Sequence, residues 1–136
     1  MRDMKTGNEP GSARASGETI LLVDDDSAIR LTLGRVLRAE GYSVLEAANG
    51  AEALDRAAAT HIDLVMLDLN MPVKNGWDTF EKLTTNNPML AVIIITARPN
   101  QLFTAVSAGV GALMEKPLDI PKLLQTVRTL LSEGPQ

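Results

Sequence analysis

Four short apolar stretches of this 136-residue chain each give way to side chains that could bind a metal ion or a phosphate group. In chain order these side chains are Asp24 and Asp25, then Asp68, then Thr96, and finally Lys116. Carboxylates without His or Cys partners suit a hard cation with oxygen ligands, and Mg²⁺ is the leading candidate. A metal ion beside a lysine and a hydroxyl suits phosphoryl transfer, in which an Asp carboxylate can itself be the nucleophile.

Each of these residues also has an ordinary structural explanation when it is taken alone. The acidic run that ends at Asp26 suits a turn and a helix N-terminus, and for Asp26 this N-cap interpretation is preferred. Asp68 could begin a turn, Thr96 could end a strand, and Lys116 could be a solvated charge. Together these explanations account poorly for the pattern, because three clustered carboxylates repel one another and raise their own pKa values. A bound cation would remove that repulsion.

The elements that must position these residues follow an alternating pattern. A short apolar run is followed by helical periodicity five times between residues 19 and 133. Gly41 can end the first helix, and Asn49 with Glu52 resembles a capping box at the start of the second. The strand candidates are apolar throughout, which indicates a parallel sheet covered by helices on both faces. Since ligands bind beyond the carboxyl ends of such strands, we expect the polar residues to meet there.

Composition narrows the functional classes. Apolar residues make up 45% of the chain, which is enough for a folded core. The 13 basic and 17 acidic residues give a net charge of −4, so we expect no nucleic-acid partner. The absence of Cys excludes thiolate sites, and His61 is expected in a surface turn. The longest apolar runs, such as Leu90–Ile95, are too short to cross a bilayer, and the N-terminus resembles no signal peptide. We therefore expect a cytoplasmic protein without a membrane partner.

The chain divides into three parts. Residues 1–18 are rich in Gly and polar residues and are expected to form a flexible N-terminal tail. Residues 134–136 are expected to be a disordered C-terminal end. Residues 19–133 have the length of one domain, and no second domain of catalytic or helix-turn-helix character is expected. Output would then go through protein–protein contact.

Four motifs carry a resemblance to a known family, and all of them occur in order at family-like spacing. They are Ile20–Ser27, Asp63–Pro72, Thr96-Ala97 and Lys116-Pro117. Through these motifs, residues 19–133 resemble the receiver domain of bacterial response regulators. The resemblance implies a flavodoxin-like, doubly wound α/β fold, in which a (βα)₅ chain forms a five-stranded parallel sheet in the order 2-1-3-4-5.

The resemblance implies a Mg²⁺-dependent phosphorylation switch. Asp68 would accept a phosphoryl group from a sensor histidine kinase or a histidine phosphotransfer protein. The cofactor Mg²⁺ would be held by Asp24, Asp25 and Asp68 together with the backbone carbonyl of Asn70. The chain would be no enzyme beyond self-phosphorylation and autodephosphorylation at Asp68. The resemblance does not identify the downstream protein partner, and it is compatible with a homodimer.

A second group of residues would respond to the phosphoryl group. The resemblance implies that Thr96, Ala97 and Lys116 contact it, and that the Lys116–Pro117 peptide bond is cis, the minority isomer. Leu113 is a departure, because the family often has a Tyr or Phe switch aromatic at this position. A leucine fills space but has no ring hydroxyl, so the usual coupling to Thr96 would change.

Three other interpretations are open from the sequence. The domain could be an interaction module that works without phosphorylation, which Leu113 favours and the complete set of acidic residues and lysine disfavours. It could also be a receiver from a longer hybrid kinase or transcription regulator. A phosphatase of the haloacid dehalogenase type needs a second Asp two residues after its nucleophile. This chain has Asn70 there, which disfavours the phosphatase.

Overall fold

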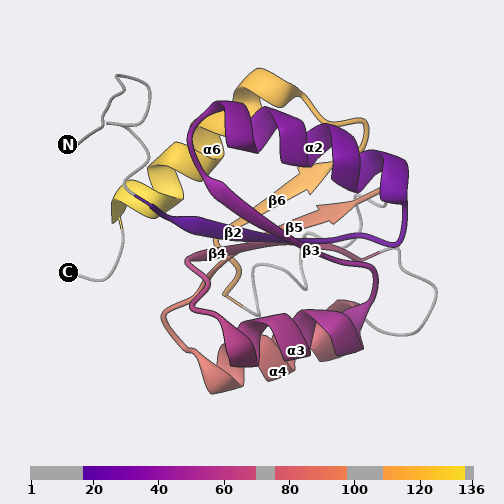
Figure 1. Ribbon diagram of the computed structural model, residues 1–136, viewed down its shortest axis with the longest axis vertical. Coiled ribbons are helices and arrows are strands. Elements are labelled where there is room, and N and C mark those ends of the chain that lie inside the picture. The colour runs from indigo at the N-terminus through magenta and orange to yellow at the C-terminus, as the bar shows by residue number, and fades with distance from the viewer. Residues whose placement is uncertain (1–16, 70–75, 98–108, 134–136) are drawn as a thin grey trace, which may run out of the picture.

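A five-stranded parallel sheet forms the centre of the protein (Figure 1). The computed structural model describes residues 17–69, 76–97 and 109–133. The strands are β2 (Thr19–Val23), β3 (Ser43–Ala47), β4 (Leu64–Asp68), β5 (Ala91–Thr96) and β6 (Ala112–Glu115). They lie in the order β3-β2-β4-β5-β6, and every neighbouring pair is parallel. Counted along the chain this is the order 2-1-3-4-5, so the predicted flavodoxin-like topology is confirmed.

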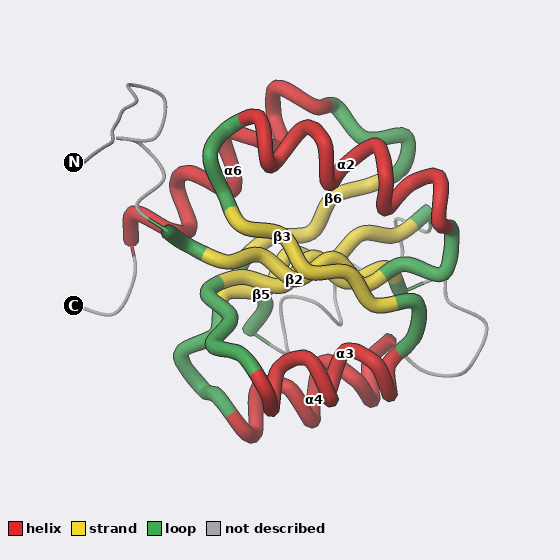
Figure 2. Tube along the Cα trace, in the orientation of Figure 1, coloured by secondary structure: helices red, strands yellow, loops and turns green. Residues whose placement is uncertain are grey.

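Helices cover both faces of the sheet (Figures 1 and 2). Helices α2 (Ser27–Ala39) and α6 (Ile120–Glu133) lie on one face, and α3 (Gly50–Ala59) and α4 (Gly76–Asn86) lie on the other. The fourth of the five predicted helices lies outside the described residues, as do most of the predicted N-terminal tail and the C-terminal end. None of the helices in the described ranges combines the length and the apolar character of a membrane span.

Alternate residues of each strand point to opposite faces of the sheet, which explains why the central strands are apolar throughout. In β2, Ile20 and Leu22 pack in the cluster beneath α2 and α6, whereas Leu21 and Val23 pack in the cluster beneath α3 and α4. All five residues of β4 are buried. Polar side chains are therefore accommodated only where these strands end.

Helix α2 begins close to the end of β2 because Asp26 caps it. The Asp26 carboxylate accepts hydrogen bonds from the N–H groups of Ala28 at 2.9 Å and Ile29 at 3.4 Å, as the sequence predicts. Beyond the other end of α2, Gly41 has a φ of 98°, a left-handed conformation that glycine adopts without strain. The predicted end of the first helix is therefore confirmed.

Helix α3 begins at a cap that differs by one residue from the predicted capping box. Asn49 accepts a hydrogen bond from the N–H of Glu52 at 2.9 Å, as predicted. The Glu52 carboxylate accepts from the N–H of Ala48 at 2.8 Å, whereas a capping box uses the N–H of the N-cap residue itself. The backbone of Asn49 is fully extended, and the Glu52 carboxylate binds the N–H of the residue that precedes Asn49.

Helices α3 and α4 approach closely where Gly50 meets the buried Thr79. A Cβ atom at Gly50 would overlap the Oγ1 atom of Thr79. We therefore expect Gly50→Ala to lower the free energy of unfolding by about 1–3 kcal/mol through overpacking, although alanine is the better helix former. Urea unfolding followed by circular dichroism measures this change.

The double substitution Gly50→Ala with Thr79→Ala is the control for this contact. With the Thr79 hydroxyl removed, the next neighbour of the new Cβ is the Thr79 Cβ at 3.5 Å, an ordinary contact. Gly50→Ala should therefore cost less in the Thr79→Ala background than in the wild type. An equal cost in both backgrounds would show that the close approach is not its cause.

Candidate functional site

The parallel sheet brings the predicted site residues to one edge. Asp24 directly follows β2, Asp68 ends β4, Thr96 ends β5, and Lys116 directly follows β6. The registers of these strands align their carboxyl ends, so the four residues converge although they are far apart in the chain.

Asp24, Asp25 and Asp68 form an acidic cluster at this edge. Each offers a carboxylate oxygen, and these oxygens all lie within 4.8 Å of one another. Asp24 is 5% exposed and Asp68 is 2% exposed, whereas Asp25 faces solvent. Convergent carboxylate oxygens are the hard donors that Mg²⁺ prefers, so this donor set fits the ion. Asn70, whose carbonyl is predicted as a further ligand, lies outside the described residues.

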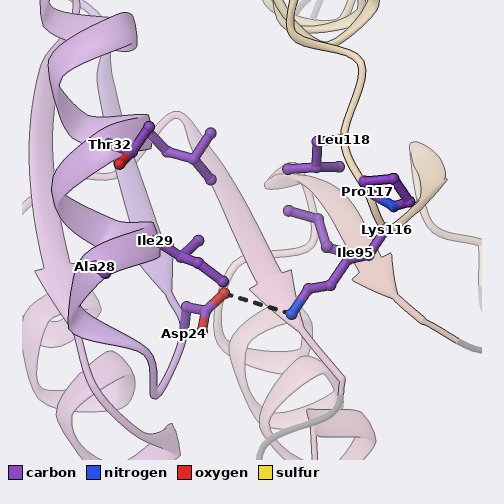
Figure 3. A pocket seen from close by; sticks show the side chains of 9 residues that line it. Asp24, Ala28, Ile29, Thr32, Ile95, Lys116, Pro117 and Leu118 are labelled. Atoms are coloured by element: carbon purple, nitrogen blue, oxygen red, sulfur yellow. Dashed lines mark ion pairs between the residues drawn. The ribbon is translucent and has the colours of Figure 1, made fainter.

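Lys116 brings a positive charge to the acidic cluster. Its Nζ lies 3.4 Å from Asp68 Oδ2 and 3.9 Å from Asp24 Oδ2, the second of which is drawn in Figure 3. One ammonium group among three carboxylates leaves a net negative charge, which favours a cation. The Lys116–Pro117 bond is cis, the isomer that the resemblance implies.

Burial raises the pKa of Asp24 from its ordinary 3.8 to about 6, because a desolvated carboxylate loses its hydration. The backbone N–H of Asp26, 2.9 Å from Asp24 Oδ1, opposes this rise in pKa. The negative charge of Asp68 adds to it, and the ammonium of Lys116 opposes it. Proton binding to Asp24 therefore relieves the cost of burying its charge.

The residues predicted to respond to the phosphoryl group lie at different depths. Thr96 is fully buried, and Ala97 is exposed directly after it. Leu113 is half-buried in β6, where it packs against the cluster beneath α3 and α4. Its register partner is Ile94, two residues before Thr96. A leucine side chain contributes only apolar contacts at this position.

A comparison with protein families connects this edge of the sheet to a known class of domain. A family model described as "Response regulator receiver domain" matches residues 20–128. The chain belongs to the response regulator receiver family. The resemblance to this family that the sequence motifs indicate is therefore confirmed. Receiver domains act as phospho-acceptor switches in two-component signalling.

Curated relatives agree with this assignment of the receiver. The chain is 37% identical over 123 residues to the response regulator MprA of Mycobacterium sp. (strain KMS), a match that covers 85% of this chain and 54% of that protein. It is 38% identical over 114 residues to MprA of Mycolicibacterium vanbaalenii, with 82% and 49% covered. The chain therefore spans about half the length of the curated relatives it matches.

Solved receiver structures share the fold. The CheY-like receiver domain protein from Methanospirillum hungatei JF-1 has a TM-score of 0.81 at 29% identity, with 86% of this chain and 95% of that chain covered. TrrA from Thermotoga maritima, solved in complex with Mg²⁺ and BeF, has a TM-score of 0.77 at 30% identity, with 83% and 98% covered. These likenesses support the fold and its sheet order.

An apolar cleft of about 320 Å³ opens beside the receiver's acidic cluster (Figure 3). Its walls come from α2, the end of β5 and the segment after β6, and Asp24 and Lys116 also line it. The other lining residues are Ala28, Ile29, Thr32, Leu33, Ile95, Pro117 and Leu118. The sequence did not predict this cleft, because its walls are distant in the chain. The only related signal is the apolar face of α2, which periodicity assigns to the core.

Proposed function

We propose that this receiver is a Mg²⁺-dependent phosphorylation switch in which Asp68 accepts the phosphoryl group. The observation that carries the proposal is the buried Asp68 carboxylate, which lies 3.4 Å from Lys116 Nζ and is grouped with Asp24 and Asp25. These three carboxylates, with the backbone carbonyl of Asn70, would hold Mg²⁺. When bound, the ion offsets negative charge on the carboxylates and on the phosphoryl oxygens.

The transfer is a displacement at phosphorus. An Asp68 carboxylate oxygen forms the new P–O bond while the P–N bond to the donor histidine breaks. The electron pair of the broken bond stays on the imidazole, which leaves as a neutral ring when its other nitrogen carries a proton. Lys116 remains protonated and pairs with a phosphoryl oxygen. The protein's own catalysis is then limited to self-phosphorylation and autodephosphorylation at Asp68.

Phosphorylation adds negative charge at the carboxyl edge, and this charge biases the packing around it. Thr96 and Ala97 would contact the phosphoryl group together with Lys116. Leu113, in the neighbouring strand, would transmit a shift of Thr96 through apolar packing instead of a ring hydroxyl. Output follows by protein–protein interaction, with a downstream partner or with a second copy of the domain.

The phosphoryl donor in this proposal is a sensor histidine kinase or a histidine phosphotransfer protein. Such a donor must bring its phosphohistidine within bonding distance of Asp68. The apolar cleft includes Asp24 and Lys116, so a protein that reaches Asp68 also covers the cleft. A small phosphodonor needs no such contact.

A charge placed in the cleft should separate protein donors from small donors. Thr32→Glu puts a carboxylate on its exposed helical wall, and burying that carboxylate against an apolar partner is costly. We expect transfer from the most active of a panel of autophosphorylated histidine kinases to fall at least roughly tenfold. Acetyl phosphate should modify this variant at the wild-type rate. Thr32→Ser is the matched control, and an unchanged kinase rate in Thr32→Glu would contradict docking on this cleft.

Intact-mass spectrometry of the wild type tests the switch itself. The protein is incubated with acetyl phosphate, with Mg²⁺ or with EDTA. We expect a single phosphoryl adduct that forms only with Mg²⁺, because the carboxylates of the cluster otherwise repel the donor. An unmodified mass for the folded protein, together with no binding of beryllofluoride, would overturn the proposal in favour of a phosphorylation-independent interaction module.

The remaining expectations from the sequence concern the length of the whole protein, its two tails, its location and its partners. The chain spans about half of each MprA relative, so a receiver that belongs to a longer hybrid kinase or transcription regulator is the alternative context. The tails at 1–18 and 134–136, the cytoplasmic location and the lack of nucleic-acid or membrane partners stay predictions.

A further inference from the structure

The backbone of Asp24 is held on both sides of its Cα atom. Its N–H donates to the carbonyl of Ala47 at 3.1 Å, and its own carbonyl accepts a hydrogen bond from Nη1 of Arg30. Its side-chain Oδ1 accepts from the N–H of Asp26 at 2.9 Å. Two of these three bonds come from backbone groups, and the third comes from a side chain in α2. Together they set the direction of the Asp24 carboxylate before any ligand arrives.

Arg30 is itself held by Glu46 of the edge strand β3. The Arg30 Nε lies 3.3 Å from Glu46 Oε1, and the Arg30 side chain is only 16% exposed. The other carboxylate oxygen of Glu46 lies 3.6 Å from Nη2 of Arg38. A guanidinium group presents its donors in a rigid fork, so Arg30 can bind Glu46 and the Asp24 carbonyl at the same time. This contact joins the edge strand to the acidic cluster.

The positive charge of Arg30 does not stabilise α2, the helix to which it belongs. Arg30 lies about one turn after the N-cap Asp26, where the helix dipole disfavours a positive charge. No acidic residue in the first turn of α2 offsets this charge. A largely buried cation at this point therefore contributes through its contacts outside the helix, which are those with Glu46 and Asp24.

We propose that Arg30 is a positioning residue for the receiver's cation site, and that Glu46 holds Arg30 in place. Arg30 acts through Asp24: it fixes the backbone of Asp24 so that the carboxylate faces Asp68. The inference rests on the proposed function, because a fixed Asp24 matters to the switch only when the cluster binds a cation.

Arg30→Met and Arg38→Met form a matched pair for the test. Both substitutions remove an α2 guanidinium that contacts Glu46, but the other bond of Arg38 goes to the carbonyl of Val44, away from the acidic cluster. Isothermal titration calorimetry with Mg²⁺ on the full chain compares them. We expect Arg30→Met to weaken binding roughly tenfold, and Arg38→Met to change it by less than about twofold. Arg30→Lys keeps the charge without the fork, so its affinity should lie between wild type and Arg30→Met.

Amide hydrogen exchange of the metal-free protein is a second readout that does not depend on the cation. In Arg30→Met we expect the amides of Asp24 and Asp26 to exchange roughly tenfold faster, while those of α6 keep their wild-type rates. If the wild type binds no Mg²⁺ but this pattern is seen, the proposed function fails, and only the hold of Arg30 on the Asp24 backbone stands. Equal weakening of Mg²⁺ binding in the two Met variants, or unchanged exchange at Asp24 and Asp26, would overturn the positioning role.

Discussion

The Asp68→Asn variant should carry no phosphoryl adduct after incubation with acetyl phosphate and Mg²⁺. The substitution keeps the size of a side chain that is 2% exposed and removes its ionised oxygen. A neutral amide is a far weaker nucleophile toward phosphorus than a carboxylate. We therefore expect the labelled fraction, measured by intact mass, to fall by at least about a hundredfold.

Two controls separate this loss from misfolding. Asp68→Asn removes one of three mutually repelling charges, so its thermal unfolding temperature should equal or exceed that of the wild type. Asp55→Asn makes the same chemical change at an exposed site on α3 and should be labelled like the wild type. Labelling of Asp68→Asn at the wild-type level would place the acceptor on another residue.

The convergence of the site residues could be predicted from the sequence. When both faces of a parallel sheet are buried, polar side chains are accommodated only at the ends of its strands. Asp68 ends a strand in which every residue is buried, and Thr96 ends another that is buried after its first residue. Asp24 follows β2, which is also buried after its first residue, whereas Lys116 follows β6, in which only Met114 is buried. The strand order then turns four separate positions in the sequence into one edge.

Contacts between side chains of different elements could not be predicted in this way. The strand candidates were predicted to be apolar throughout, but β3 runs from Ser43 to Ala47 and includes Glu46, which breaks the apolar pattern. Glu46 is accommodated because Arg30 and Arg38 bind its two carboxylate oxygens. In the sequence, Arg30 is only a polar position on a helix, since its partners depend on how α2 packs against β3.

Without Mg²⁺, Asp24→Asn should be more stable than the wild type at pH 7.5, and the difference should disappear toward pH 4. The pKa of Asp24 is about 6 in the folded protein and near 3.8 for an ordinary Asp, so the folded state binds this proton more tightly. The stability linked to this carboxyl is therefore fully present below pH 3.8 and is lost as the pH rises through 6. Asparagine does not ionise, so the variant escapes a loss on the order of 1–2 kcal/mol after solvent screening. Thermal unfolding in EDTA between pH 4 and 8 measures the difference.

Millimolar Mg²⁺ at pH 7.5 should then raise the unfolding temperature of the wild type far more than that of Asp24→Asn. A ligand stabilises the folded state that binds it, and the variant lacks one of the three negative charges that converge on the site. KCl at the same ionic strength controls for screening, and Asp55→Asn should respond like the wild type. Equal stabilisation of Asp24→Asn by Mg²⁺ would locate the ion elsewhere. If the stability difference between Asp24→Asn and the wild type did not change with pH, the charge of Asp24 would not destabilise the folded protein. If both expectations hold, the buried charge of Asp24 that destabilises the metal-free receiver is also a charge that attracts the ion.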